Sequence, residues 1–100
     1  MMKHALFVRL EAKPGKEKEV AEFLLAGLGM AQQEGGTPLW FALQLGPSTF
    51  GVFDAFYDEA GRQAHLNGAI AQALGASAPK LLAQAPSIER IDVLGAKLPG

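Results

Sequence analysis

Residues 39–57 read LWFALQLGPSTFGVFDAFY, and this stretch decides the fold. In residues 39–45, side chains alternate with the period of two that is typical of a β-strand. Residues 50–57 form a second apolar run, and the four residues between the runs, GPST, are typical of a hairpin loop. Trp40 and Ala42 lie opposite the Leu/Phe row of the first strand. The stretch therefore predicts an antiparallel pair of strands with two mostly apolar faces.

The residues on each side of this hairpin predict one helix and one further strand. Apolar residues next to the hairpin recur at helical spacing, whereas both ends of the chain alternate as strands do. The expected elements are a strand at 3–11, a helix at 16–34, strands at 39–45 and 50–57, a helix that begins after Asp58 and is interrupted by Pro79, a short helical piece at 80–84 and a strand at 88–97. The order βαββαβ predicts a ferredoxin-like α+β fold, in which both helices cover one face of a four-stranded antiparallel sheet.

Glycine, proline and aspartate residues predict where the helices begin, bend and end. Asp58 is expected to cap the second helix, and Pro79 is expected to interrupt it. Gly35-Gly36 is expected to end the first helix in a left-handed turn. Within that helix, Gly27 and Gly29 indicate a bend or the close approach of another segment.

Apolar side chains on both faces of the predicted sheet indicate a partner subunit. Two helices cover only one face, and the other face of a monomer should be polar. The opposed rows are Phe53 and Ala55 against Phe50, Val52 and Phe56 in the third strand, and Ile91 and Val93 against Ile88 and Leu94 in the fourth. Face-to-face packing of two such sheets about a twofold axis predicts a homodimeric α/β barrel.

The length and composition limit the chain to one small domain and argue against several classes of protein. One hundred residues allow a single core, so residues 1–100 are expected to form one domain. Nine Lys and Arg against ten Asp and Glu give a formal net charge of −1, which argues against nucleic-acid binding. No run approaches the about 20 apolar residues of a membrane span, and the first residues lack a signal-peptide pattern. With no Cys in the chain, a cytoplasmic protein without disulfides or a thiol nucleophile is expected.

Three stretches resemble the antibiotic biosynthesis monooxygenase superfamily of dimeric α/β-barrel proteins. Residues 53–66, FDAFYDEAGRQAHL, resemble that family's strand-to-helix junction, and residues 86–94, PSIERIDVL, resemble its last strand. The segment KPGK at 13–16, followed by a Glu-rich helix, is similar as well. The resemblance covers residues 4–98 and implies a homodimer with a cavity in each subunit between the helices and the sheet.

The resemblance also implies a range of activities. Characterised relatives include monooxygenases that oxidise quinols or polycyclic phenols with O₂ and with neither flavin nor metal, while others degrade haem and many have no established activity. The haem-degrading relatives use an Asn on the first strand and a Trp on the third, together with a His on the second helix. This chain keeps only His65 of that set, so haem degradation is not expected.

His65 is the main catalytic candidate. It lies beside the apolar stripe of the second helix, about 100° from Leu66, where a side chain can reach a cavity. An imidazole titrates near neutrality, as a general base for a phenol or quinol should, and the resulting anion can pass an electron to O₂. Asp54 and Tyr57 are the candidates for orienting the ring. The alternative is a half-buried histidine bonded to the backbone or to Glu59.

Four further residues are candidates for binding a substrate: Arg62, Trp40, Asp54 and Tyr57. Arg62 lies inside the apolar stripe, so it is expected either to pair with Asp58 or Asp54 or to hold a substrate oxyanion. Trp40, the only Trp, is expected to line either the cavity or the dimer seam. Tyr57, the only Tyr, ends its strand, where its hydroxyl group can be half exposed. The alternative for both aromatic residues is that they only pack against other side chains and do not contact a substrate.

No residue pattern predicts a metal or a cofactor. His4 and His65 have no metal-ligand spacing with the carboxylates, and no Gly-rich phosphate loop follows a strand. With the resemblance, the expected function is a cofactor-independent monooxygenase that oxidises a quinol or related phenolic aromatic, with His65 as general base. The alternative is a non-catalytic binding or stress-associated dimer whose cavity holds a small apolar ligand.

Overall fold

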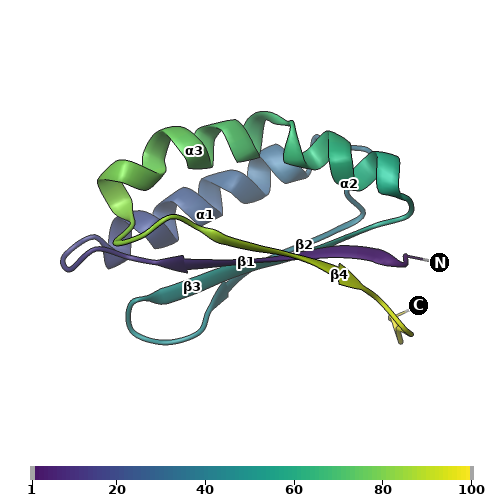
Figure 1. The fold of residues 1–100 in the computed structure, drawn as a ribbon, viewed down its shortest axis with the longest axis horizontal. Helices are drawn as coiled ribbons and strands as arrows, with labels where there is room; N and C mark the ends of the chain where they lie inside the picture. The colour runs from purple at the N-terminus through teal and green to yellow at the C-terminus, as the bar shows by residue number, and fades with distance from the viewer. Residues whose placement is uncertain (1, 100) are drawn as a thin grey trace.

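The structure is a computed structural model that describes residues 2–99. Its elements are β1 (His4–Glu11), α1 (Glu17–Ala31), β2 (Leu39–Gln44), β3 (Thr49–Phe56), α2 (Glu59–Leu66), α3 (Ala69–Leu81) and β4 (Ser87–Asp92). The strand order is β2-β3-β1-β4, and every neighbouring pair is antiparallel. The helices all lie on one face of the sheet (Figure 1). The predicted ferredoxin-like α+β fold is confirmed, with the second helical segment divided into α2 and α3.

The face of the sheet that the helices cover carries the hydrophobic core. Across β1 and β3, Leu6 pairs with Asp54, Val8 with Val52 and Leu10 with Phe50. The buried residues of α1 recur every three or four positions and are Val20, Leu24, Gly27 and Ala31. Leu24 and Val20 belong to the same core cluster as Leu10 and Phe50. Asp54 is the exception, because it is a carboxylate with 0% exposure on an apolar face.

The opposite face of the sheet carries no helix and is apolar as well. Phe7 of β1 pairs with Phe53 of β3, and Phe53 pairs with Phe41 of β2, so three aromatic side chains form one row across the sheet. Phe41 is 50% exposed. The expectation of a second apolar face is confirmed for this row in β1, β2 and β3, but in β4 the row continues with Glu89, and the predicted Val93 and Leu94 lie beyond that strand. The dimer that the expectation suggested stays a prediction.

The second helical segment is interrupted at Asn67 and Gly68, so the prediction that Pro79 interrupts it is wrong. Gly68 has an extended backbone, with φ −89° and ψ −175°, directly before α3. A Cβ at Gly68 would lie 3.2 Å from the carbonyl oxygen of Ala64, which favours glycine at this sharp step. Pro79 lies near the end of α3, which ends at Leu81. Its missing N–H removes only one helical hydrogen bond there, and no separate piece forms at 80–84.

The first helix ends without the left-handed turn that was predicted for it. α1 ends at Ala31, and the C-cap residue Gln32 has a right-handed φ of −64°. Among residues 2–99, a positive φ is found only at Gly15, where it is 85°. The loop at Gly36 instead approaches α2 closely at Gly61, because a Cβ on Gly61 would lie 2.9 Å from the Gly36 carbonyl oxygen.

Gly27 allows the indole ring of Trp40 to approach α1. A Cβ at Gly27 would lie 3.4 Å from two indole carbons, whereas a Cβ at Gly29 would meet nothing within 4 Å. The predicted close approach is confirmed at Gly27, and Gly29 has no such role. Trp40 therefore faces the helices and not the open face of the sheet.

β4 is shorter than predicted and ends at Asp92. Asp92 pairs with His4, the first residue of β1, so a longer β4 has no neighbouring strand. The backbone N–H of Val93 still donates to the carbonyl oxygen of Lys3 at 2.8 Å. Beyond it, residues 94–99 form no strand, and Leu94 is 98% exposed.

Candidate functional site

His65 lies between two carboxylate groups from distant parts of the chain. It occupies the last turn of α2 and is 8% exposed. Its Nδ1 lies 2.6 Å from Oε1 of Glu34 in the loop after α1, and its Nε2 lies 2.9 Å from Oδ2 of Asp54 on β3. The ring is therefore oriented by Asp54, which was one of the two candidates together with Tyr57. Glu59, the partner in the alternative interpretation, does not contact the ring. We call Glu34, His65 and Asp54 the carboxylate–histidine triad.

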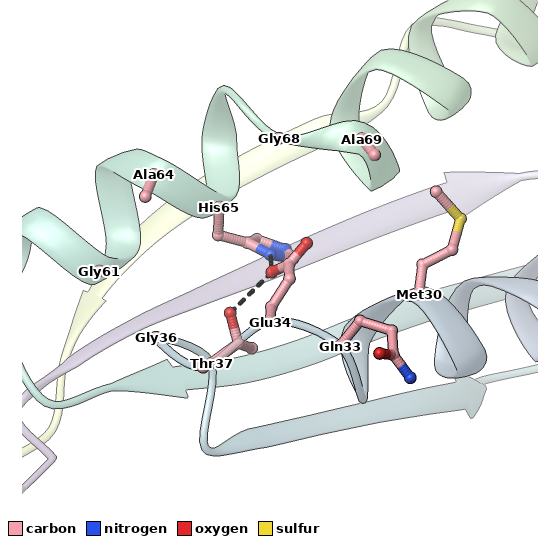
Figure 2. A pocket seen from close by; sticks show the side chains of 11 residues that line it. Met30, Gln33, Glu34, Gly36, Thr37, Gly61, Ala64, His65, Gly68 and Ala69 are labelled. Carbon is pink, nitrogen blue, oxygen red and sulfur yellow. Dashed lines mark hydrogen bonds and ion pairs between the residues drawn. The ribbon is translucent and has the colours of Figure 1, made fainter.

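A tight turn and a hydroxyl group hold Glu34 against the imidazole ring. The backbone N–H of Glu34 donates to the Ala31 carbonyl oxygen at 3.0 Å, and that of Thr37 donates to the Glu34 carbonyl oxygen at 3.2 Å. The buried hydroxyl group of Thr37 also donates to Oε1 of Glu34 at 2.8 Å. One carboxylate oxygen thus accepts from the Thr37 hydroxyl group and also lies within hydrogen-bond distance of Nδ1 of His65 (Figure 2).

Asp54 is a fully buried carboxylate whose compensating charge is His65. Its side chain is 1% exposed, and Leu6 and Trp40 lie beside it on the neighbouring strands. No residue in the described part of the chain gives either carboxylate oxygen a well-aligned hydrogen bond. The 2.9 Å contact with His65 is therefore an ion pair more than a directed hydrogen bond. An uncompensated carboxylate in this position is very unfavourable, so Asp54 requires a cation beside it.

The two carboxylates favour the charged form of the imidazole ring. Burial lowers the pKa of His65, but the close contacts of its ring with the negatively charged Asp54 and Glu34 outweigh burial and raise the pKa above its ordinary value of 6.5. A protonated ring has an N–H on each nitrogen and can serve both carboxylates, whereas a neutral ring has only one. The neutral, basic form of His65 therefore requires a higher pH than an ordinary histidine does.

An open pocket of about 510 Å³ lies on the Glu34 side of the ring, and we call it the outer pocket. The end of α1, the loop that follows it and the facing sides of α2 and α3 form its walls (Figure 2). Gly35, Gly36, Gly61, Gly68, Ala64 and Ala69 are among the lining residues. Because these side chains are small or absent, they leave the hollow unfilled. Its volume lies within the about 300–1,000 Å³ of typical small-molecule sites.

A much smaller space, the inner cavity, lies on the Asp54 side of the ring between the helices and the sheet. Its volume is about 50 Å³, and its wall is mostly aliphatic, with Asp54, Trp40 and His65 as the polar members. The family resemblance implied a ligand cavity at this place. However, 50 Å³ is well below the about 150 Å³ of a cavity that holds benzene. An aromatic ring fits the outer pocket and not the inner cavity, and His65 forms part of both walls.

Of the four predicted substrate-binding residues, the structure brings Trp40 and Asp54 to His65. Both line the inner cavity, whereas Arg62 and Tyr57 line neither the inner cavity nor the outer pocket. Tyr57 follows the end of β3 and is 62% exposed. The position of these last two residues gives them no contact with a ligand in either space.

Arg62 connects α2 to the sheet. It is 6% exposed, and its guanidinium group donates to the carbonyl oxygens of Ala5 at 3.2 Å and Ile91 at 3.4 Å. It also pairs with Glu59, and its hydrogen bond to that carboxylate lowers the pKa of Glu59. These contacts agree with the interpretation of Arg62 as a structural residue.

The predicted carboxylate partners of Arg62 have other roles. Asp58 caps α2, as expected, and accepts a hydrogen bond from the backbone N–H of Gly61 at 2.7 Å. Asp54 pairs with His65. The prediction that Arg62 pairs with Asp58 or Asp54 is therefore wrong, because Glu59, one turn before Arg62, lies closer to the guanidinium group.

Glu34 and Thr37 are the site residues that the sequence did not indicate. Glu34 lies 31 positions before His65, so no local spacing connects the two. The only signal in the sequence is an acidic residue placed directly before Gly35-Gly36 at the end of a helix.

Two properties of the described residues bear on other classes of site. Within residues 2–99, no group of three or more His, Cys, Asp or Glu side chains is arranged to hold a metal ion. None of the helices in the same range has the length and apolar character to cross a bilayer.

Comparison with solved structures first gives the class of the fold. A proposed antibiotic biosynthesis monooxygenase from Nitrosomonas europaea matches with a TM-score of 0.82 at 17% identity, over 92% of this chain and 99% of that chain. Another from Caulobacter crescentus matches with a TM-score of 0.79 at 18% identity, over 94% of this chain and 92% of that chain. At these identities the comparison establishes a shared fold, and it confirms the resemblance at that level.

A protein with much higher sequence similarity defines the family. The NE2512 protein of unknown function from Nitrosomonas europaea is 64% identical, with a TM-score of 0.97 over 100% of this chain and 97% of that chain. The chain belongs to the same family as that protein. No protein-family model matches the chain, and no curated protein matches it.

Proposed function

We propose that the protein is a cytoplasmic monooxygenase that oxidises a phenol or quinol with O₂ and needs no bound cofactor. The aromatic ring of the substrate lies in the outer pocket, with its hydroxyl group at Glu34. The observation that carries this proposal is the carboxylate–histidine triad, which presents one carboxylate to the outer pocket and buries the other. The fold shared with proposed antibiotic biosynthesis monooxygenases supports this class of reaction.

The triad can accept the proton of the substrate hydroxyl group. Above the raised pKa of His65 the ring is neutral, and its one N–H is assigned to Nε2, because within residues 2–99 the buried Asp54 has no other donor beside it whereas Glu34 also accepts from Thr37. Nδ1 then faces Glu34 with a lone pair at 2.6 Å. A proton that passes from the substrate to Glu34 moves on to Nδ1, and the resulting imidazolium ion lies between two carboxylates. His65 is the base that holds the proton, and Glu34 is the group that touches the substrate.

Deprotonation allows the substrate to react with O₂. The phenolate passes one electron to O₂, the two radicals combine at a ring carbon, and the hydroperoxide that forms loses water. A phenol and O₂ give a quinone and water, and a quinol and O₂ give a hydroxyquinone and water. One oxygen atom enters the product, and the other leaves as water with the proton that His65 held and the hydrogen of the ring carbon that becomes a carbonyl carbon, so no external reductant is required.

A homodimer is part of the same proposal. The row of Phe7, Phe53 and Phe41 on the uncovered sheet face supports packing against a second copy, since an apolar patch of this kind marks an interface. The outer pocket is lined by residues of the helices and the loop after α1, and the helices lie on the other face of the sheet (Figure 1). Packing through the sheets therefore leaves each subunit's pocket open.

Oxygen consumption by chelator-treated protein, with a panel of reduced quinones and polycyclic phenols, tests the proposal. Glu34→Gln keeps the size of the side chain but removes the proton acceptor, so it should lower the rate by about 10²–10⁴-fold. Glu22→Gln is the matched control, because it makes the same change at an exposed position of α1 and should leave the rate unchanged.

Two results would contradict parts of this proposal. Equal rates for the two variants would remove Glu34 from the mechanism. Protein that binds these aromatics in the outer pocket but consumes no O₂ would favour the alternative of a non-catalytic, ligand-binding dimer.

A further inference from the structure

Trp40 and Asp54 place two buried polar groups beside each other behind His65. They are paired in register across β2 and β3, so their side chains leave the sheet on the same face. Both side chains line the inner cavity. Nε1 of Trp40 and Oδ1 of Asp54 are shielded from solvent, and within residues 2–99 neither atom has a hydrogen-bond partner.

These two atoms have complementary hydrogen-bonding needs. An indole N–H only donates, and an ionised carboxylate only accepts. Buried polar groups in native proteins are almost always hydrogen-bonded, because a buried group without a partner has lost its hydrogen bonds to water and gained none in exchange. A molecule between them has to accept from Trp40 and donate to Asp54, and a hydroxyl group does both.

The size of the inner cavity restricts this molecule further. The volume of about 50 Å³ exceeds the about 10–15 Å³ that one water molecule requires. It is too small for a phenol, as the comparison with benzene shows. Both ring nitrogens of His65 already contact carboxylates, and the remaining wall is apolar and includes Leu6, Val52 and Ile70, so a second polar group on the ligand finds no partner.

We infer that the inner cavity is a binding site for a single hydroxyl group, held between Nε1 of Trp40 and Oδ1 of Asp54 and occupied by water in the resting protein. The occupant extends a chain of contacts that runs from Trp40 through Asp54 and His65 to Glu34 and ends at Thr37. Trp40 is then a positioning residue, because it acts on the triad through the bound hydroxyl group. This site does not require that the protein be an oxygenase.

The single tryptophan of the chain makes the inner cavity accessible to NMR, since its indole N–H gives one resonance. In the full chain, this N–H should show a nuclear Overhauser cross-peak to a water molecule that tumbles with the protein. Methanol should shift the resonance saturably, whereas acetonitrile, which has no O–H to donate to Asp54, should not. A water cross-peak without a methanol effect assigns the site to water alone. A saturable shift with methanol shows that the inner cavity also binds the hydroxyl group of small alcohols.

Trp40→Phe tests the positioning role, because it removes the donor and keeps an aromatic ring. The titratable groups that face His65 are Asp54 from β3 and Glu34 from the loop after α1. Without the indole N–H, the bound hydroxyl group donates less strongly to Asp54, so the carboxylate keeps more of its charge for His65 and the midpoint of the His65 NMR titration should rise. Phe23→Leu is the matched control, because it changes another aromatic wall residue that has no polar atom, and it should leave this midpoint unchanged.

Two results would exclude the hydroxyl-binding site, and a third would refute the positioning role of Trp40. An indole N–H with neither a water cross-peak nor a response to methanol would exclude the site. A direct hydrogen bond from Trp40 to Asp54 in a crystal structure at atomic resolution would exclude it as well. Equal His65 midpoints in Trp40→Phe and Phe23→Leu would refute the positioning role of Trp40.

Discussion

His65→Ala should destabilise the fold mainly through the carboxylate that it leaves behind. The Asp54 side chain is 1% exposed, and Nε2 of His65, at 2.9 Å, carries its compensating charge. Removing one partner of a buried ion pair costs about 3–5 kcal/mol, a large share of the about 5–15 kcal/mol that stabilise a typical domain. In a domain of this length, each 1 kcal/mol corresponds to about 4–8 °C, so Tm should fall by about 12 °C or more. Urea unfolding at pH 7 and one fixed protein concentration measures the free energy directly.

The double variant His65→Ala/Asp54→Asn is the control for this reasoning. It removes the stranded charge together with its partner, so it should recover much of the lost stability, and the two changes should be strongly non-additive. The loss in His65→Ala alone should also shrink at acidic pH, where a stranded carboxylate can take up a proton. A loss below about 1 kcal/mol, the value of an exposed ion pair, or additive losses in the double variant would refute the claim that His65 compensates Asp54.

The close packing at Gly61, the contacts of Arg62 and the uncovered sheet face each lead to a measurable expectation. Gly61→Ala places a Cβ 2.9 Å from the Gly36 carbonyl oxygen and should cost about 1–3 kcal/mol in urea unfolding. Gly75→Ala, with nothing within 4 Å, should stabilise α3 by about 0.5–1 kcal/mol, and equal effects of the two changes would argue against the close approach. Arg62→Ala should cost about 1–3 kcal/mol for each backbone carbonyl group left without its donor. Arg62→Lys should recover only part of that loss, because an ammonium group lacks the planar fork, and an unchanged Tm in Arg62→Ala would refute the structural role. Analytical ultracentrifugation at micromolar concentration should give twice the chain mass of 10.5 kDa, and a stable species of single chain mass would exclude the barrel.

The order of the elements and the character of both sheet faces could be predicted from the sequence, because both depend on local patterns. The alternation in residues 39–57 determines which side chains share a face of the sheet, wherever that face points. The cap at Asp58 and the close approach at Gly27 are local features in the same sense. The proximity of Asp54 to His65 could also be predicted from the sequence, because a short turn connects β3 to α2.

The rest depends on contacts between distant segments, which no local pattern records. Glu34 contacts His65 from a loop in which Gly36 packs on Gly61, and that approach is a property of two segments together. The step at Gly68 has a local cause, the carbonyl oxygens of the preceding turn, but a single glycine inside a helical pattern does not by itself predict a break. Proline is the stronger helix breaker by intrinsic propensity, but Pro79 lies where only residues 80 and 81 of α3 follow it.

The pH dependence of O₂ consumption, set beside the NMR titration of His65 in the same protein, tests the central claim that the triad takes up the substrate proton. Asp54 and Glu34 raise the pKa of His65 above 6.5, so the basic form is populated only at higher pH. The account predicts that kcat/KM rises with pH and that its midpoint coincides with the NMR midpoint of His65, above 6.5. A rate that stays constant across the titration of His65, or a midpoint that does not match it, would contradict the account.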